Sequence, residues 1–235
     1  MNRYDQIMQI QAVIFDRDLT LLYFDPAQLA AVEEQMAAIA PELPQHAAVR
    51  AWTSWPGPWP QHRDDEPAFW ADFWASLGHT HGLQPAQIVR LTVEVGAIYH
   101  TTFGAYPDAA PTVRSLRSGG LRLAILTNYE LPSVDRTLAN AGIDPAQFDV
   151  ALTSAMLGVY KPDRRAFLAT AEALNLPPSA CLFVDDLAEN VAAARSVGML
   201  AYQIDRSLPV DDLDAARLST LDSLIGLLLP PFTRD

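Results

Sequence analysis

The 235-residue sequence contains a single cysteine, Cys181, and a single lysine, Lys161. One cysteine excludes a disulfide within the chain and is typical of a protein from a reducing compartment. Cys181 lies in an apolar run, so we expect it to be a small buried core residue rather than a nucleophile.

Positive charge is also scarce, since 16 basic residues stand against 28 acidic ones and give a net charge of -12. Nucleic acids and anionic membranes bind clustered Lys and Arg, so we expect neither as a partner. The late apolar run 224–229 is far shorter than the ~20 residues of a membrane helix. Residues 1–11 contain no signal-peptide core, and we predict a cytoplasmic protein.

Half of the residues are hydrophobic, and five short runs of consecutive apolar residues predict buried strands. Consecutive rather than alternating apolar residues are typical of parallel strands covered on both faces. Amphipathic stretches that end near Gly or Pro separate the later runs, as helices would. The strands are 12–15, 122–127, 150–153, 181–184 and 200–204, and the helices are 111–117, 132–141, 164–174 and 188–197. This alternation predicts an α/β fold with ligands at the carboxyl ends of the strands.

A long insertion follows the first strand and interrupts this alternation of strands and helices. It exceeds the length of an ordinary strand-to-helix connection, and it contains all five tryptophans and all five histidines. Its pattern predicts helices over 26–40, 67–77 and 85–103, the first with Asp25 as N-cap. We therefore predict a helical domain at 24–106 and a core domain made of 1–23 and 107–235.

The first strand leads directly into Asp16-Arg17-Asp18-Leu19-Thr20. Two carboxylates this close repel each other unless a cation lies between them or their pKa values separate. Most isolated pairs of this spacing merely cap a turn, so this motif alone does not identify a function.

The second and third strands are followed by groups that suit an anion. Thr127 and Asn128 offer a hydroxyl and an amide, which can hold phosphate oxygens, although an ordinary polar turn has the same residues. Lys161 follows the third strand, in a chain where every other basic residue is arginine. A single lysine either remains by chance or indicates a position that needs a compact, strongly hydrated charge.

The fourth strand ends in Asp185 and Asp186, with Asn190 one helical turn beyond. Mg²⁺ prefers carboxylate, carbonyl and water oxygens and often uses only one or two carboxylates. Asp16 and Asp186 supply such a pair if their strands are neighbours.

The ordered set D-x-D-x-T, T-N, K-P and D-D-x-x-x-N resembles the four motifs of the haloacid dehalogenase-like superfamily. The resemblance covers nearly the whole chain, and the helical insertion is similar to the type 1 cap of subfamily I phosphatases. It implies a Rossmann-like parallel sheet of order 5-4-1-2-3, with the first and fourth strands adjacent. The sequence departs from the family at Leu19, where glycine is usual.

The resemblance implies a Mg²⁺-dependent phosphatase with an aspartyl-phosphate intermediate. Asp16 would be the nucleophile and Asp18 the general acid/base. Thr127 and Lys161 would bind the phosphoryl group, and Asn128 would lie at the edge of the substrate.

The implied metal ligands are Asp16, Asp186 and the backbone carbonyl of Asp18. Asp185 and Asn190 would not bind the metal and would instead contact and support the ligand residues. The implied substrate is a small phosphomonoester, such as a sugar phosphate, phosphoglycolate or a nucleotide.

Other readings share some of these residues. A phosphomutase would have the same motifs, and a binding-only relative would keep them without turnover. A 2-haloacid dehalogenase expels halide without a proton and lacks an acid at the position of Asp18. A receiver-type phospho-acceptor has its acidic pair first and about half this length.

The tryptophans of the insertion have two readings. Trp52, Trp55 and Trp59 could stack on a sugar or base. They could equally pack the interior of the insertion, as Trp70 and Trp74, one turn apart, suggest.

Overall fold

The structure is a computed structural model that describes residues 3–229, except for the side chains of 3–4 and 97–99. Within this range six strands form one sheet in the order β5-β4-β1-β6-β7-β8, and every neighbouring pair is parallel. The strands are β1 (Ala12–Phe15), β4 (Arg122–Thr127), β5 (Val150–Thr153), β6 (Cys181–Asp185), β7 (Leu200–Ile204) and β8 (Arg217–Leu218). Apart from the added edge strand β8, this is the predicted order 5-4-1-2-3 counted from β7 to β5.

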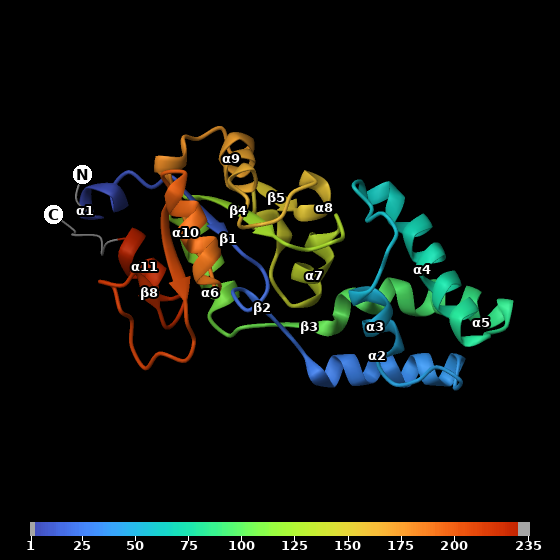
Figure 1. Cartoon of the computed structure of the whole chain (residues 1–235). Coiled ribbons are helices and arrows are strands. Elements are labelled where there is room, and N and C mark those ends of the chain that lie inside the picture. The colour runs from blue at the N-terminus through green and yellow to red at the C-terminus, as the bar shows by residue number, and fades with distance from the viewer. Residues whose placement is uncertain (1–2, 230–235) are drawn as a thin grey trace.

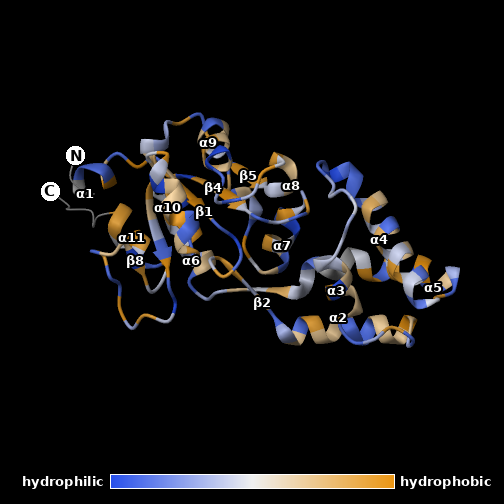
Figure 2. Cartoon of the chain, viewed as in Figure 1, coloured by the Kyte–Doolittle hydropathy of each residue, from blue (hydrophilic) through white to orange (hydrophobic). Residues whose placement is uncertain are grey.

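The central strand β1 is buried along its whole length, and its hydropathy is apolar throughout (Figure 2). Its residues alternate between two apolar clusters, so that Val13 and Phe15 lie on one face of the sheet and Ala12 and Ile14 on the other. A helical layer covers each face, which explains why the strand shows no polar alternation.

Helices α6, α7 and α11 contribute to the first cluster and α9 and α10 to the second. The core helices are α1 (Arg3–Ile7), α6 (Ala109–Ser118), α7 (Val134–Asn140), α8 (Ser154–Leu157), α9 (Arg164–Ala173), α10 (Ala188–Ser196) and α11 (Ser223–Leu228), with 3₁₀ turns η4 (Pro145–Gln147) and η5 (Pro178–Ala180). Cys181 is fully buried at the start of β6, as predicted, and burial raises the pKa of its thiol to about 11.

The remaining helices form a separate group at one end of the molecule (Figure 1). They are α2 (Pro26–Ile39), α3 (Ala47–Thr53), η1 (Arg63–Asp65), α4 (Glu66–His81), α5 (Pro85–Arg90), η2 (Leu91–Val95) and η3 (Gly96–Thr102). An antiparallel ribbon of β2 (Leu22–Phe24) and β3 (Phe103–Ala105) joins this group to the sheet, with Phe24 opposite Phe103. The chain therefore enters and leaves the helical group through two adjacent strands.

Two of the predicted helices of this group differ from the structure, and α3 was not predicted. The helix predicted over 67–77 is too short, because it continues through Gly78, where α5 approaches closely: a β-carbon there would lie 2.5 Å from Ile88 Cγ1. Helix α4 continues to His81 and ends at Gly82, whose φ of 70° is left-handed. The expected helix over 85–103 is also wrong in form, since it changes at Leu91 to a π-helical turn and at Gly96 to a 3₁₀ helix.

A buried carboxylate ties the helical group to the core. Glu66, at the start of α4, is 3% exposed and accepts hydrogen bonds from Ser133 N and Oγ, both at 2.7 Å. His100 Nε2 lies 3.3 Å from the same hydroxyl. Arg63 and Asp135 add an ion pair across the junction, on its exposed side. The two parts are thus joined by polar contacts as well as by the ribbon.

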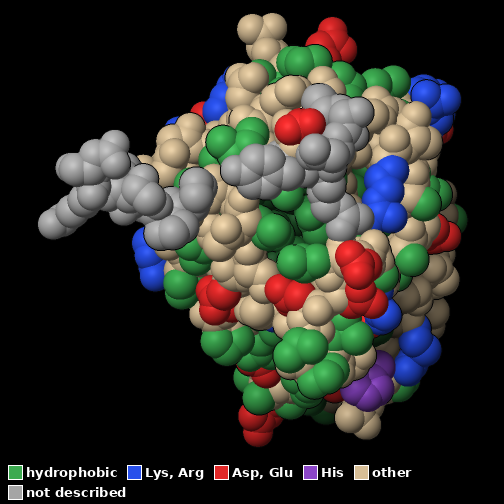
Figure 3. All heavy atoms as spheres, turned by 90° about the vertical axis from the view of Figure 1, so that its left-hand side faces the viewer, with side chains coloured by type: hydrophobic (Ala, Val, Ile, Leu, Met, Phe, Trp, Pro, Cys, Tyr) green, Lys and Arg blue, Asp and Glu red, His purple; other side chains and the backbone are tan. Residues whose placement is uncertain are grey.

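The opposite end of the core carries acidic and basic side chains scattered among apolar ones (Figure 3). In the described part of the chain, no helix has both the length and the apolar character needed to cross a membrane.

Candidate active site

Four sequence motifs meet at the carboxyl edge of the sheet. Asp16 follows β1, and its N–H donates to Val184 O of the neighbouring strand β6 at 2.8 Å. Asp185 ends β6, and Thr127 ends β4 on the other side of β1. Because the strands are parallel and adjacent, residues far apart in sequence reach the same edge.

Lys161 lies at the centre of this edge. Its Nζ is 2.6 Å from Asp16 Oδ1 and 2.6 Å from Asp185 Oδ2, and its side chain is only 1% exposed. Burial opposes the charge on Lys161, but the two carboxylates outweigh that effect and raise its pKa. The ammonium is therefore held protonated between the two acids.

Asp185 is a fully engaged acceptor. Besides Lys161, it accepts from Asn190 Nδ2, at 3.0 Å to each oxygen, and from Leu187 N at 2.8 Å. These donors hold the Asp185 carboxylate in place, and the carboxylate in turn orients the Lys161 ammonium. The supporting role of Asp185 and Asn190 toward a metal stays a prediction.

The acids are arranged as a cation site would need them. Asp16, Asp185 and Asp186 each offer a carboxylate oxygen, and these oxygens lie within 4.8 Å of one another. Burial raises the pKa of Asp16 to about 7, with Lys161 opposing and Asp185 and Asp18 adding to the rise. Burial and Asp185 together raise the pKa of Asp186 to about 6. A bound cation would relieve this repulsion, so the donor set fits Mg²⁺.

Thr127 brings an unused donor to the same edge. Its side chain is 1% exposed, and its Oγ1 has no hydrogen-bond partner among residues 3–229. A buried hydroxyl left unpaired costs free energy, which a ligand oxygen would recover.

Asn128 makes two hydrogen bonds that the sequence did not predict. Its Nδ2 donates to Lys161 O at 2.9 Å, and its Oδ1 accepts from Lys161 N at 2.7 Å. The side chain is partly exposed and keeps a second N–H, and its position at the substrate's edge stays a prediction. Asn128 holds that loop against β4.

The loop after β1 turns sharply at Leu19, which has a φ of 58° and is 54% exposed. Leu21 and Leu22 both donate backbone hydrogen bonds to Arg17 O, at 2.9 and 2.8 Å. The family's usual glycine would adopt this left-handed conformation freely, whereas Leu19 adopts it with a β-carbon. The turn is kept despite the substitution.

Arg17 is the residue of this edge that sequence reasoning missed. It is 2% exposed and forms an ion pair with Asp18. Burial is unusual for arginine. The only sequence feature that marks Arg17 is its position between Asp16 and Asp18.

The tryptophans pack with one another inside the helical group. Trp52 contacts Trp59, Phe69, Trp70 and Phe73, with ring centroids 4.7 to 6.2 Å apart. Of the two readings of these residues, the structure favours packing.

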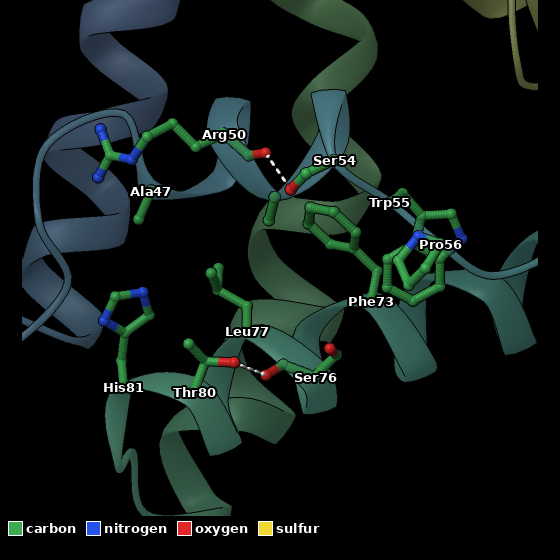
Figure 4. A pocket seen from close by; sticks show the side chains of 11 residues that line it. Ala47, Arg50, Ser54, Trp55, Pro56, Phe73, Ser76, Leu77, Thr80 and His81 are labelled. Atoms are coloured by element: carbon green, nitrogen blue, oxygen red, sulfur yellow. Dashed lines mark hydrogen bonds between the residues drawn. The ribbon is translucent and has the colours of Figure 1, made fainter.

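A hollow of about 260 Å³ lies between α3 and α4, with Arg50 and His81 toward one end and Trp55 and Phe73 toward the other (Figure 4). All of its lining residues belong to the helical group. It is therefore separate from the strand-end acids.

The fold and this edge define an α/β enzyme whose acids lie at the carboxyl ends of parallel strands. The family model for haloacid dehalogenase-like hydrolases matches residues 10–198, and the chain belongs to that family. It is 35% identical over 226 residues to phosphatase MT3486 of Mycobacterium tuberculosis (strain CDC 1551 / Oshkosh), an alignment that covers 93% of this chain and 98% of that protein.

Solved structures of two kinds are similar to this one. A 2-haloacid dehalogenase from Pseudomonas syringae pv. Tomato DC3000 has a TM-score of 0.68 at 22% identity, over 93% of this chain and 98% of that one. A HAD phosphatase from Thermococcus onnurineus has a TM-score of 0.59 at 25% identity, with the same coverage. The first likeness concerns the fold alone.

Proposed function

We propose that this hydrolase cleaves phosphomonoesters through an aspartyl-phosphate formed on Asp16. The observation that carries the proposal is the buried Lys161 at 2.6 Å from Asp16, together with the unpaired hydroxyl of Thr127 at the end of the neighbouring strand β4. Together they offer positive charge and a donor where phosphoryl oxygens would lie when Asp16 attacks. The name of the relative MT3486, a phosphatase, supports the same reaction.

The reaction has two balanced steps. First, a carboxylate oxygen of Asp16 bonds to phosphorus while the bond to the leaving oxygen breaks, and Asp18 gives its proton to that oxygen. Then Asp18 takes a proton from water, whose oxygen attacks phosphorus and releases phosphate and the Asp16 carboxylate. Lys161 and Thr127 bind the phosphoryl oxygens throughout.

Mg²⁺ is the proposed cofactor, held by Asp16, Asp186 and the backbone carbonyl of Asp18. When bound, it would supply positive charge beside the phosphoryl oxygens. Asp186 suits this role better than Asp185, because the only donor to its carboxylate among the described residues is its own backbone N–H, whereas Asp185 already accepts from Lys161 and Asn190.

We further propose that residues 24–106 act as a cap that selects a small phosphorylated metabolite. The two-stranded ribbon and the contact of Glu66 with Ser133 support a hinged cover beside the strand ends. A sugar phosphate, phosphoglycolate or a nucleotide would be the substrate class.

Asp18 favours hydrolysis of a phosphate ester over dehalogenation, although dehalogenases share the fold. A halide leaves without a proton, so an acid two residues after the nucleophile has no function there. A phosphomutase would use the same residues and return the phosphoryl group to a sugar rather than to water.

The deciding experiment measures phosphate release from p-nitrophenyl phosphate and a panel of metabolite monoesters, with Mg²⁺ and with EDTA. We expect Mg²⁺-dependent turnover in the wild type, loss of turnover in Asp16→Asn, and wild-type turnover in Asp72→Asn, which removes an exposed acid of α4. Halide release from a 2-haloacid, or folded protein without ester turnover, would refute the phosphatase assignment.

A further inference from the structure

Arg17 lies between two aromatic rings. Its guanidinium carbon is 3.7 Å from the ring centroid of Tyr129 and 4.5 Å from that of Phe103. Both rings are buried, and their centroids are 6.5 Å apart in an edge-to-face arrangement. A planar cation between two rings gains a cation–π interaction with each and loses its freedom to rotate.

The same guanidinium grips Asp18 with two hydrogen bonds. Nε lies 3.1 Å from Asp18 Oδ1, and Nη2 lies 2.8 Å from Oδ2. Nη1 reaches Thr137 Oγ1 at 3.4 Å, which adds a third point of attachment. A bidentate pair fixes both the position and the plane of a carboxyl group. The side chain of Asp18 is nevertheless 47% exposed, so it can still reach a substrate.

One of the two rings belongs to the ribbon that carries the helical group. Phe103 is the first residue of β3, and its ring packs edge-on against Phe24 of β2, with centroids 5.7 Å apart. Tyr129 follows β4 in the core. Arg17 therefore bridges the core and the base of the helical group, with Asp18 at its tip.

We propose that Arg17 is the positioning residue of Asp18. This inference rests on the proposed function in assigning proton transfer to Asp18. Arg17 fixes the carboxyl group where it can reach the leaving oxygen, while Asp16 and Lys161 make no hydrogen bond to Arg17 in the described part of the structure. Loss of Arg17 should thus impair proton donation and spare the attack on phosphorus.

The test compares two esters that differ in their need for a proton. p-Nitrophenolate leaves readily without one, whereas an alkoxide leaves only when it is protonated. General acid catalysis is typically worth ~10²–10⁴-fold. For Arg17→Lys and Arg17→Gln we expect kcat/KM on an alkyl phosphate to fall about 10- to 100-fold and kcat/KM on p-nitrophenyl phosphate less than about 3-fold. Asp18→Asn should show the same pattern with a larger loss.

Arg206→Lys is the matched control. Arg206 also stacks on a ring, with its guanidinium carbon 3.7 Å from the Tyr106 centroid, and also binds a carboxylate twice, at Asp108. It makes no contact with Asp18 among the described residues. Any loss of kcat/KM in Arg206→Lys should be equal on the two esters. Equal losses on both esters in the Arg17 variants, or no loss, would overturn the proposal.

A crystal structure of Arg17→Lys decides the positioning claim without turnover. We expect Asp18 to be displaced, while Asp16 and Lys161 keep their 2.6 Å contact. An unmoved Asp18 refutes the proposal. Absence of ester turnover in the wild type would refute the proposed function alone, because the position of Asp18 would still be decided by this structure.

Discussion

Single side chains set the geometry of the loop after β1. Leu19 takes a left-handed backbone conformation there, with a φ of 58°. For an L-residue with a β-carbon, that conformation costs roughly 1–2 kcal/mol. Its exposed side chain recovers little of this cost through packing. The loop therefore stores strain one residue away from Asp18.

Leu19→Gly removes this strain. The gain of about 1–2 kcal/mol is offset by the roughly 0.5–1 kcal/mol that glycine loses on ordering. We expect the free energy of unfolding to stay unchanged or to rise by up to about 1.5 kcal/mol, as measured by urea denaturation.

The control is Leu168→Gly, which changes another exposed leucine, in the middle of α9. There, a helical glycine should cost about 1 kcal/mol. Equal destabilisation by the two substitutions would show that Leu19 is not strained.

At the scale of elements, the pairing of β1 with β6 decides the chemistry. Phe15 lies opposite Val184, so the residues that follow both strands meet at one edge. Asp16 and Asp186 are brought together in this way, and their pKa values are raised to about 7 and about 6. Burial is the largest cause of both rises, and repulsion from Asp185 and Asp18 adds to it, so a cation bound at this edge would stabilise the ionised acids.

Asp186→Asn should stabilise the metal-free protein and weaken its response to Mg²⁺. A carboxyl group whose folded pKa is raised costs stability that grows between its unfolded pKa, 3.8, and its folded pKa, about 6, and is complete above that. After allowance for solvent screening, we expect a gain of about 1 kcal/mol at pH 7.5, shrinking as the pH falls through 6.

Thermal unfolding with Mg²⁺ and with EDTA measures both effects. A ligand at 100 times its Kd stabilises the wild type by about 2.7 kcal/mol, and this increment should be largely lost in Asp186→Asn. An unchanged Mg²⁺ increment would rule out Asp186 as a ligand. Asp163→Asn, which alters a partly exposed acid paired with Arg165, serves as the comparison.

The sequence pattern was sufficient to predict the strands that are buried on both faces of the sheet. The strands beginning at Ala12, Arg122, Val150 and Leu200 have the predicted bounds, because each contains a run of at least three consecutive apolar residues. The strands of the ribbon escaped prediction, since each has three residues and β2 passes from buried to exposed along its length.

The strand-end residues of the site were predictable, but the contacts between them were not. Asp16, Thr127, Lys161 and Asp185 follow recognisable strands, and parallel pairing brings such residues together. The setting of Arg17 depends on Phe103 and Tyr129, which come from distant parts of the chain. No local pattern encodes which rings will enclose an arginine.

For the whole molecule, the helical group and the core share one apolar cluster, and polar contacts such as that of Glu66 with Ser133 add to their junction. All five tryptophans lie in the helical group, so their fluorescence reports on that part alone. Far-UV circular dichroism reports on the entire chain. The two signals can therefore separate unfolding of the helical group from unfolding of the protein.

Ser133→Ala should loosen this junction. It removes the hydroxyl that donates to Glu66, and a buried carboxylate that loses a partner costs about 1–3 kcal/mol. We expect the tryptophan fluorescence midpoint in urea to fall by more than the circular dichroism midpoint. Ser196→Ala, whose exposed hydroxyl bonds only within its own helix, should move neither. Equal shifts of both midpoints would mean that the junction does not unfold separately.

The burial of Lys161 has a practical consequence for chemical labelling. The chain has one ε-amine, its side chain is 1% exposed, and two carboxylates keep it protonated. Acylating reagents need an accessible, unprotonated amine, so the folded protein should take up no label on any lysine. Opening of the sheet edge would admit one acyl group at Lys161, and intact-mass spectrometry would then give the fraction of molecules in which the site has opened.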